Sequence, residues 1–140
     1  MHHKIVAFLL LASSLAVCYG QETETDKIYL VVTGVVQKSN PLTRSPYCDI
    51  QVRYDNKSSY ELLRISGEIL IGGGMTVPFT NVNVRPGRLD SMSHTIRSIR
   101  DCDEVNLREG IELRLSQCQI SEVDERNCQL LIALQASEEL

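Results

Sequence analysis

The sequence has 140 residues, of which 43% are hydrophobic and only 5% are aromatic, with no tryptophan. Its 14 basic and 18 acidic residues give a formal net charge of −4 at neutral pH. Acids and bases are interspersed without a basic stripe, which argues against nucleic acid as a partner. The length fits a single domain that is large enough to bury a hydrophobic core.

The first twenty residues have the layout of a cleaved secretory signal peptide. A basic start precedes an apolar run over residues 5–17, and small residues stand before a cleavage point after Gly20. The run is shorter than the roughly 20 apolar residues that a membrane-spanning helix needs. Cleavage after Ala16 and lipidation of Cys18 are the alternatives. Cleavage after Gly20 leaves 21–140 as one domain, in the secreted or periplasmic compartment, with a net charge of −5.

Removal of this leader also removes Cys18 and leaves an even number of cysteines: Cys48, Cys102, Cys118 and Cys128. Four cysteines in an exported domain predict two disulfides, with three possible pairings. We favour Cys48 with Cys102 and Cys118 with Cys128, because a hairpin between consecutive strands would bring the second pair together. The spacings show no paired Cys-x-x-Cys knuckles, so we expect no zinc site and no cofactor.

The first predicted strands follow the leader. Residues 28–36 are rich in β-branched residues and are apolar at both odd and even positions, which indicates a strand buried on at least one face. Two prolines mark a loop at 39–46, since a residue before proline avoids helical geometry. Residues 48–54 then alternate between apolar and polar, which predicts a half-buried strand with Cys48 on its inner face.

Residues 63–84 are predicted to form two strands around the glycine triplet at 72–74. Gly67 indicates a bend or bulge in the first strand. In the second, the apolar face changes phase at Asn81, and Pro78 places the strand at a sheet edge. The triplet could suggest a phosphate cradle, but neither a helix start nor a Lys-Ser/Thr pair follows it. A hairpin turn is therefore the prediction.

The rest of the chain is less regular. A Pro-Gly turn occupies 85–87, 94–100 is ambiguous between a strand and a helical turn, and 102–105 forms a corner. A strong strand covers 111–115, and the apolar run 128–134 is predicted to be the last strand. About seven strands without a long helix favour an all-β fold, a two-sheet antiparallel sandwich of immunoglobulin or fibronectin type III type. A small closed β-barrel is the alternative.

Two polar groups could carry chemistry. One combines a nucleophile, a base and an acid: Asp90, Ser91, Ser93 and His94. The other offers carboxylates for glycoside hydrolysis: Glu104, Glu109 and Glu112. Serine catalysis joins side chains from distant parts of a fold, whereas small polar residues in one segment usually mark a loop. The carboxylates fit a solvated face, so we expect no enzymatic activity.

Two further features concern the surface. Asn56-Lys57-Ser58 is a glycosylation sequon, which matters if the source is eukaryotic. Basic residues surround the Pro-Gly turn: Arg85, Arg88, Arg97 and Arg100. These arginines could contact an acidic partner, although solubility explains them more simply.

The strand Cys48-Asp49-Ile50-Gln51-Val52, the turn Val84-Arg85-Pro86-Gly87 and the Cys102…Cys118…Cys128 ending together resemble the interleukin receptor mimic protein A family of pathogenic enterobacteria. The resemblance extends to size, leader and strand order over most of the chain. It implies a secreted, virulence-associated, fibronectin type III-like domain. Such a protein would bind host cytokines by imitating their receptors and form a strand-exchanged homodimer. The resemblance transfers no binding residues.

The function that we predict is a secreted, non-enzymatic protein-binding module. A periplasmic or surface envelope component with a structural or chaperone-like role is the alternative, and a small hydrolase or inhibitor is a third. A sandwich of this kind would use its loops and sheet edges as working surfaces. The Ser39–Pro46 connection and the edge at Pro78 are candidate points for strand exchange.

Overall fold

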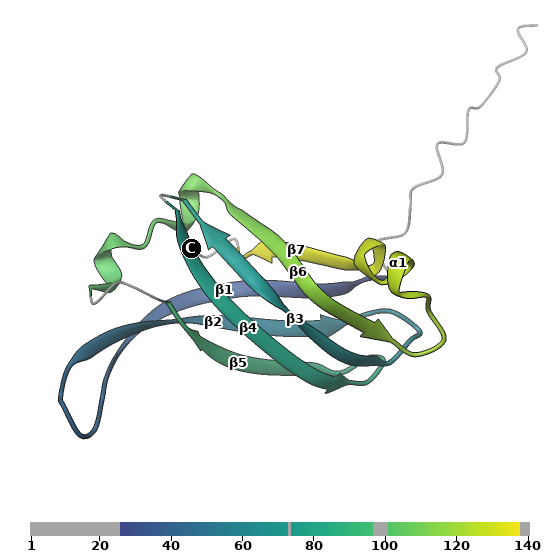
Figure 1. Cartoon of the computed structure of the whole chain (residues 1–140), viewed down its shortest axis with the longest axis horizontal. Helices are drawn as coiled ribbons and strands as arrows, with labels where there is room; N and C mark the ends of the chain where they lie inside the picture. The colour runs from purple at the N-terminus through teal and green to yellow at the C-terminus, as the bar shows by residue number, and fades with distance from the viewer. Residues whose placement is uncertain (1–25, 73, 97–100, 138–140) are drawn as a thin grey trace, which may run out of the picture.

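The computed structural model describes residues 26–72, 74–96 and 101–137. These residues form seven strands in two sheets that pack face to face (Figure 1). One sheet has the strand order β5-β2-β1-β7 and the other has the order β4-β3-β6. The strands are β1 (Ile28–Ser39), β2 (Pro46–Asn56), β3 (Leu62–Ile71), β4 (Met75–Val84), β5 (Leu89–Thr95), β6 (Ile111–Ile120) and β7 (Ile132–Ala136). The predicted all-β sandwich is confirmed, and the closed-barrel alternative is wrong.

One strand pair departs from the antiparallel prediction. β7 runs parallel to β1, from the pair Ile28–Ile132 onward. A parallel pair needs a crossover connection, and here the chain crosses between the sheets after β6 through α1 (Glu125–Cys128) and the 3-10 helix η3 (Gln129–Leu131). The prediction that Cys128 begins the last strand is therefore wrong, and β6 and β7 do not form a hairpin.

Two disulfides connect the cysteine pairs that the sequence analysis favoured. Cys48 in β2 is bonded to Cys102 in the 3-10 helix η1 (Cys102–Glu104), with the Cα atoms 5.5 Å apart. Cys118 in β6 is bonded to Cys128 at the end of α1, with the Cα atoms 5.8 Å apart. The second bond thus holds the crossover helix against the sheet that the chain has just left.

The core lies between the sheets and follows the alternation of the sequence. In β2, Ile50, Val52 and Tyr54 face inward and are at most 1% exposed. β3 contributes Ile65 and Ile69 from the opposite sheet, both fully buried. Burying one such side chain stabilises the folded state by about 1.5–3 kcal/mol. The period-two pattern therefore both identifies the strands and fixes which face of each is buried.

Bulges explain where the alternation shifts. The register of β3 against β6 changes at Gly67, as predicted, and the extra residue lies opposite it, at Ser116. A Cβ atom on Gly67 would collide with the backbone carbonyl of Arg114, so the position requires glycine. A second irregularity places Leu62 in the core, while Leu63, where the predicted strand begins, is only partly buried.

β4 is an edge strand, as Pro78 indicated. The phase change predicted at Asn81 is misplaced, because Asn81 is buried on the inner face. It occurs at Asn83, which has a φ of 61°, a left-handed conformation that asparagine tolerates better than most residues. Val82 is consequently 51% exposed, on the outer face.

The structure describes only some of the segments that had a less regular sequence pattern. β5 begins at Leu89, before the ambiguous 94–100 segment, of which 97–100 lie outside the described residues. The predicted corner at 102–105 contains η1. The signal-peptide prediction falls on residues that the structure does not describe. No helix in the described part of the chain is long and apolar enough to cross a membrane.

Candidate functional site

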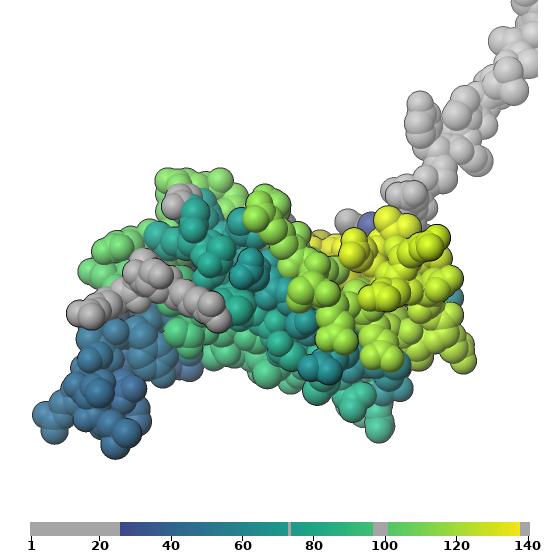
Figure 2. All heavy atoms as spheres, viewed as in Figure 1, coloured from purple at the N-terminus to yellow at the C-terminus, as the bar shows by residue number. Residues whose placement is uncertain are grey.

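The β1–β2 hairpin projects beyond the body of the sandwich (Figures 1 and 2). The two strands pair continuously from Ile28–Asn56 to Ser39–Pro46, with one register shift between Val32 and Gly34. The buried part of β1 ends at Val32, and the strand is partly or fully exposed from there to its end. The hairpin is therefore a long ladder of which only one half is packed into the core.

The tip of this hairpin, Asn40–Ser45, is held by hydrogen bonds within the loop. The Asn40 carboxamide oxygen accepts from the backbone N–H groups of Leu42 and Thr43, at 2.9 and 3.2 Å. The Asn40 backbone carbonyl accepts from the N–H of Arg44, at 2.8 Å, and the Asn40 N–H donates to Ser45 O, at 2.9 Å. One asparagine thus organises the whole turn, a role that this residue type commonly takes.

The organised tip displays one apolar side chain. Leu42 is 92% exposed, more than any other large hydrophobic residue of the described chain. Arg44 beside it adopts a φ of 58° and is also exposed. An apolar anchor on a loop with fixed geometry can enter a pocket of another molecule at little cost in conformational entropy. The sequence analysis singled out this connection, but for strand exchange and without Leu42.

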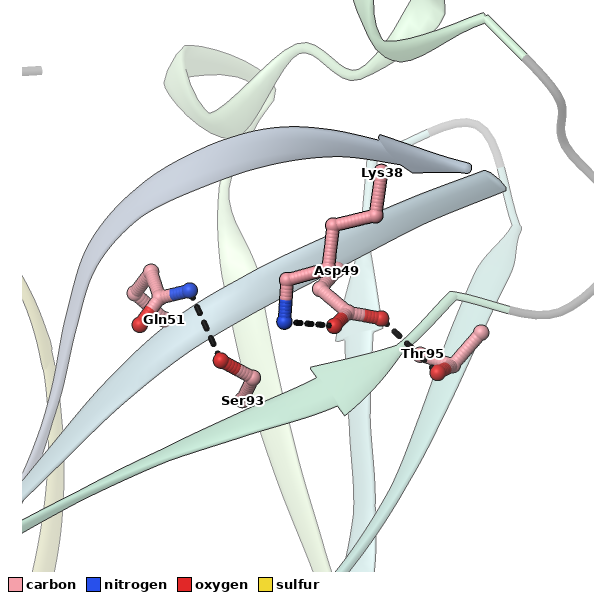
Figure 3. Close-up of polar contacts among 5 residues, drawn as sticks. All are labelled: Lys38, Asp49, Gln51, Ser93 and Thr95. Carbon is pink, nitrogen blue, oxygen red and sulfur yellow. Dashed lines mark hydrogen bonds and ion pairs between the residues drawn. The ribbon is translucent and has the colours of Figure 1, made fainter. Parts of the chain in front are cut away.

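The base of the hairpin is fixed by a polar cluster on the outer face of the sheet (Figure 3). Asp49 is only 4% exposed, and its carboxylate meets Lys38 Nζ at 2.7 Å. The same carboxylate accepts from the Thr95 hydroxyl at 2.7 Å, which ties β2 to β5. This hydrogen-bonded contact with Asp49 raises the pKa of Lys38. Both strands of the hairpin are therefore anchored where they leave the sandwich.

A shallow cleft lies beside the same base. Val35 of β1 lines it together with Val105, Leu107 and Arg108, and its volume is about 220 Å³. The disulfide from Cys48 to η1 brings this segment against the hairpin. Apolar side chains form most of the cleft, which continues the exposed surface of the hairpin toward the body.

The proposed nucleophile and base do not come together. His94 faces inward, and its Nε2 lies 2.8 Å from the Tyr54 hydroxyl, whereas Ser93 faces outward and accepts a hydrogen bond from Gln51. Burial lowers the pKa of His94, against an opposing effect of Asp49. Burial also raises the pKa of Tyr54. The alternation of β5 thus separates the groups that serine catalysis would need.

Two of the three carboxylates lie beside Gly72 and Gly74. Glu109 and Glu112 line an open hollow of about 370 Å³ together with Gly72 and Gly74. Two carboxylates would repel a phosphate there, and β3 and β4 pair as the predicted hairpin up to Ile71 and Met75. Glu112 pairs instead with Arg114 at 3.2 Å, on the surface. Glu104 lies in η1 and does not line this hollow.

The sequon has a structural role. Asn56 is fully buried, and its side-chain amide donates to the carbonyls of Tyr60 and Val84, both at 2.8 Å. Its oxygen accepts from the N–H and hydroxyl of Ser58. A glycan on this nitrogen would break that network, so the folded protein does not present the sequon as a surface site. Of the four arginines that could contact an acidic partner, Arg85 and Arg88 flank the Pro-Gly turn, while positions 97 and 100 lie outside the described residues.

Comparisons with protein-family models, with curated proteins and with solved structures found no match for this chain. Within 26–72, 74–96 and 101–137, no three His, Cys, Asp or Glu side chains gather as metal ligands would. The hairpin tip is therefore the candidate site with the best-defined geometry.

Proposed function

We propose that this protein is a secreted, non-enzymatic binding module that recognises another protein through the tip of its β1–β2 hairpin. The observation that carries the proposal is Leu42, an apolar side chain that is 92% exposed on a loop held by internal hydrogen bonds. Secretion is supported by two disulfides, which persist in oxidising compartments.

The physical advantage of the tip is its preorganisation. A flexible loop loses conformational entropy when it binds, whereas the contacts of Asn40 fix this loop beforehand. Burial of the Leu42 side chain in a partner's pocket would contribute about 1.5–3 kcal/mol. A few residues commonly carry most of the energy of a protein interface, and we propose Leu42 as one of them here.

The partner that we propose is a host cytokine, as the family resemblance implies. Its binding pocket would be apolar to accept Leu42 and acidic at its rim to match Arg44, which is exposed beside it. The cleft at Val35 and Leu107 would lie along the same side of the interface as a secondary contact.

Binding of the purified protein, from residue 21 onward, to a panel of purified host cytokines and surface receptors tests this function. We expect at least one panel member to bind, and Leu42→Ser to weaken that binding at least tenfold, which corresponds to about 1.4 kcal/mol. Leu130→Ser is the matched control, because Leu130 is 72% exposed in η3, directly after α1, which lies at the opposite end of the molecule (Figure 1). Equal losses in the two variants, or no binding to any panel member, would contradict the proposal.

Fractionation of the source cells separates release from retention. The proposal expects the protein in the cell-free medium. Recovery only in the envelope fraction would favour the structural or chaperone-like alternative.

A further inference from the structure

The edges of the two sheets differ in how well they are protected against pairing with another chain. Among the described strands, β4, β5, β6 and β7 are edges. β4 carries Pro78 and the left-handed Asn83, and β6 carries the bulge at Ser116 with the charged pair Glu112–Arg114. β7 has only five residues. Proline, bulges, charges and short length all oppose edge-to-edge association.

β5 has neither a proline nor a bulge, and its only charged residue is Asp90. Its seven residues pair with β2 in one uninterrupted register, from Asp49–Thr95 to Asp55–Leu89. The strand contains no proline, lysine or arginine, and all its residues except His94 are exposed. Figure 1 shows β5 along the border of its sheet, with no other strand beyond it.

The hydrogen bonds at the two ends of β5 show which backbone groups point outward. Ile96 N donates to Cys48 O at 2.8 Å, and Asn56 N donates to Arg88 O at 3.1 Å. Residues with even numbers therefore bond to β2. In an antiparallel ladder the bonding direction alternates, so the remaining backbone N–H and C=O groups face the open edge. They belong to Leu89, Ser91, Ser93 and Thr95, and in the single chain the Ser91 N–H donates to Asp90 Oδ1 at 3.0 Å.

The sequence of β5 is complementary to itself in the antiparallel direction. When two copies align about Met92, Ser91 lies opposite Ser93 of the second copy, and Leu89 lies opposite its Thr95. In both pairs the two residues have outward backbone groups, so they can form hydrogen bonds across the interface. In this register each of the seven residues of β5 lies opposite a residue of the second copy. Any other register with the same parity leaves part of each strand unpaired.

The same register matches the side chains on the inner face. Met92 meets Met92 of the second copy, and each Met92 is 37% exposed in the single chain. Asp90 lies opposite His94 of the second copy. Because the Tyr54 hydroxyl lies 2.8 Å from Nε2 of His94, a donating hydroxyl leaves the proton on the other ring nitrogen. That nitrogen would then donate to the Asp90 carboxylate across the axis, and the Ser91 N–H would exchange Asp90 Oδ1 for the Ser93 carbonyl of the second copy.

We propose that the β5 edges of two copies of this chain pair antiparallel about Met92, which gives a symmetric dimer with one continuous eight-stranded sheet. Each chain keeps its own β5, so no strand is exchanged. The interface is isologous, since the same seven residues contribute from both sides. It leaves the hairpin tips free, and the dimer would therefore present two Leu42 anchors.

Sedimentation equilibrium combined with site-directed crosslinking tests this dimer. We expect twice the chain mass at high micromolar concentration and oxidation of Met92→Cys to a covalent dimer on a non-reducing gel. Leu89→Cys is the matched control, because the register separates the two copies of position 89 by about 20 Å. Peptide mapping of the crosslinked band identifies the bond between the two introduced cysteines.

A backbone substitution tests the hydrogen bonds themselves. Ser93→Pro removes an outward N–H and is expected to raise the dimer dissociation constant at least tenfold. Ser93→Ala keeps that N–H and loses only the hydrogen bond from Gln51. It should leave dimerisation unchanged. A monomer at all concentrations, a crosslink at position 89 in place of 92, or equal weakening by Pro and Ala would overturn the proposal.

Discussion

The two ends of the β1–β2 ladder have opposite chemistry. At one end a polar side chain, Asn56, is fully buried, and at the other an apolar side chain, Leu42, is almost fully exposed. Asn56 uses its amide to join the loop at 58–60 to Val84 of β4, so that end is part of the folded core. Leu42 contacts little within its own chain and is available to another one. The same pair of strands thus combines a stabilising end with a recognition end.

The largest effect is expected at the buried end. Asn56→Ala removes both amide donors and leaves the buried carbonyl of Val84 without its partner, which should lower the free energy of unfolding by about 3 kcal/mol. Urea denaturation measures the loss. Asn106→Ala is the control, because Asn106 caps an exposed turn and should cost about 1 kcal/mol or less. Similar losses in the two variants would show that the buried network is not special.

A smaller effect is expected where the hairpin leaves the sandwich. Asp49→Ala removes the partner of both Lys38 and Thr95, and it should lower the free energy of unfolding by about 2 kcal/mol. Asp55→Ala is a matched control on the same strand, because its contact with Lys57 is long, 3.8 Å, and should contribute less than about 0.5 kcal/mol. If Asp55→Ala cost as much as Asp49→Ala, the polar cluster would not be the anchor of the hairpin.

The smallest expected effect is a change of stability with pH, and it depends on His94. Burial lowers the pKa of His94 in the folded protein, below the value of 6.5 for an exposed histidine. The unfolded chain therefore binds the proton more readily, and stability rises with pH in this range. The contribution is fully present above pH 6.5 and is lost as the pH falls from there through the lower folded pKa.

Denaturation of the wild-type protein and of His94→Gln between neutral pH and pH 5 measures this contribution. The free energy of unfolding should fall less steeply with acidification in His94→Gln. Parallel pH profiles would contradict the assignment of His94 as a buried neutral side chain.

The sequence predicted those parts of the fold that depend on local pattern. The alternation of Cys48, Ile50, Val52 and Tyr54 identified β2 and its inner face, because one side of a strand in a sandwich is buried and the other is not. Gly67 marked a bulge and Pro78 an edge for similarly local reasons.

The sequence could not predict features that depend on distant partners. The parallel pairing of β7 with β1 requires knowledge of where the crossover leads, and an apolar run such as 128–134 is also compatible with the turn of helix that it partly forms. Asn56 matched a sequon, and nothing local indicated that Val84 and Tyr60 would enclose it. Leu42 had one visible signal, a leucine in a polar loop, but exposure at a projecting tip is a property of the fold.

The account depends most on the hairpin tip being ordered before it meets a partner. Amide hydrogen exchange of the free protein measures this order at individual N–H groups. The account predicts that the amides of Leu42, Thr43 and Arg44 exchange at least tenfold more slowly than in an unstructured peptide. Asn40→Ala should abolish this protection at Leu42 and Thr43, whose N–H groups donate to the Asn40 carboxamide. Exchange of these amides at the unstructured rate in the wild-type protein would contradict it.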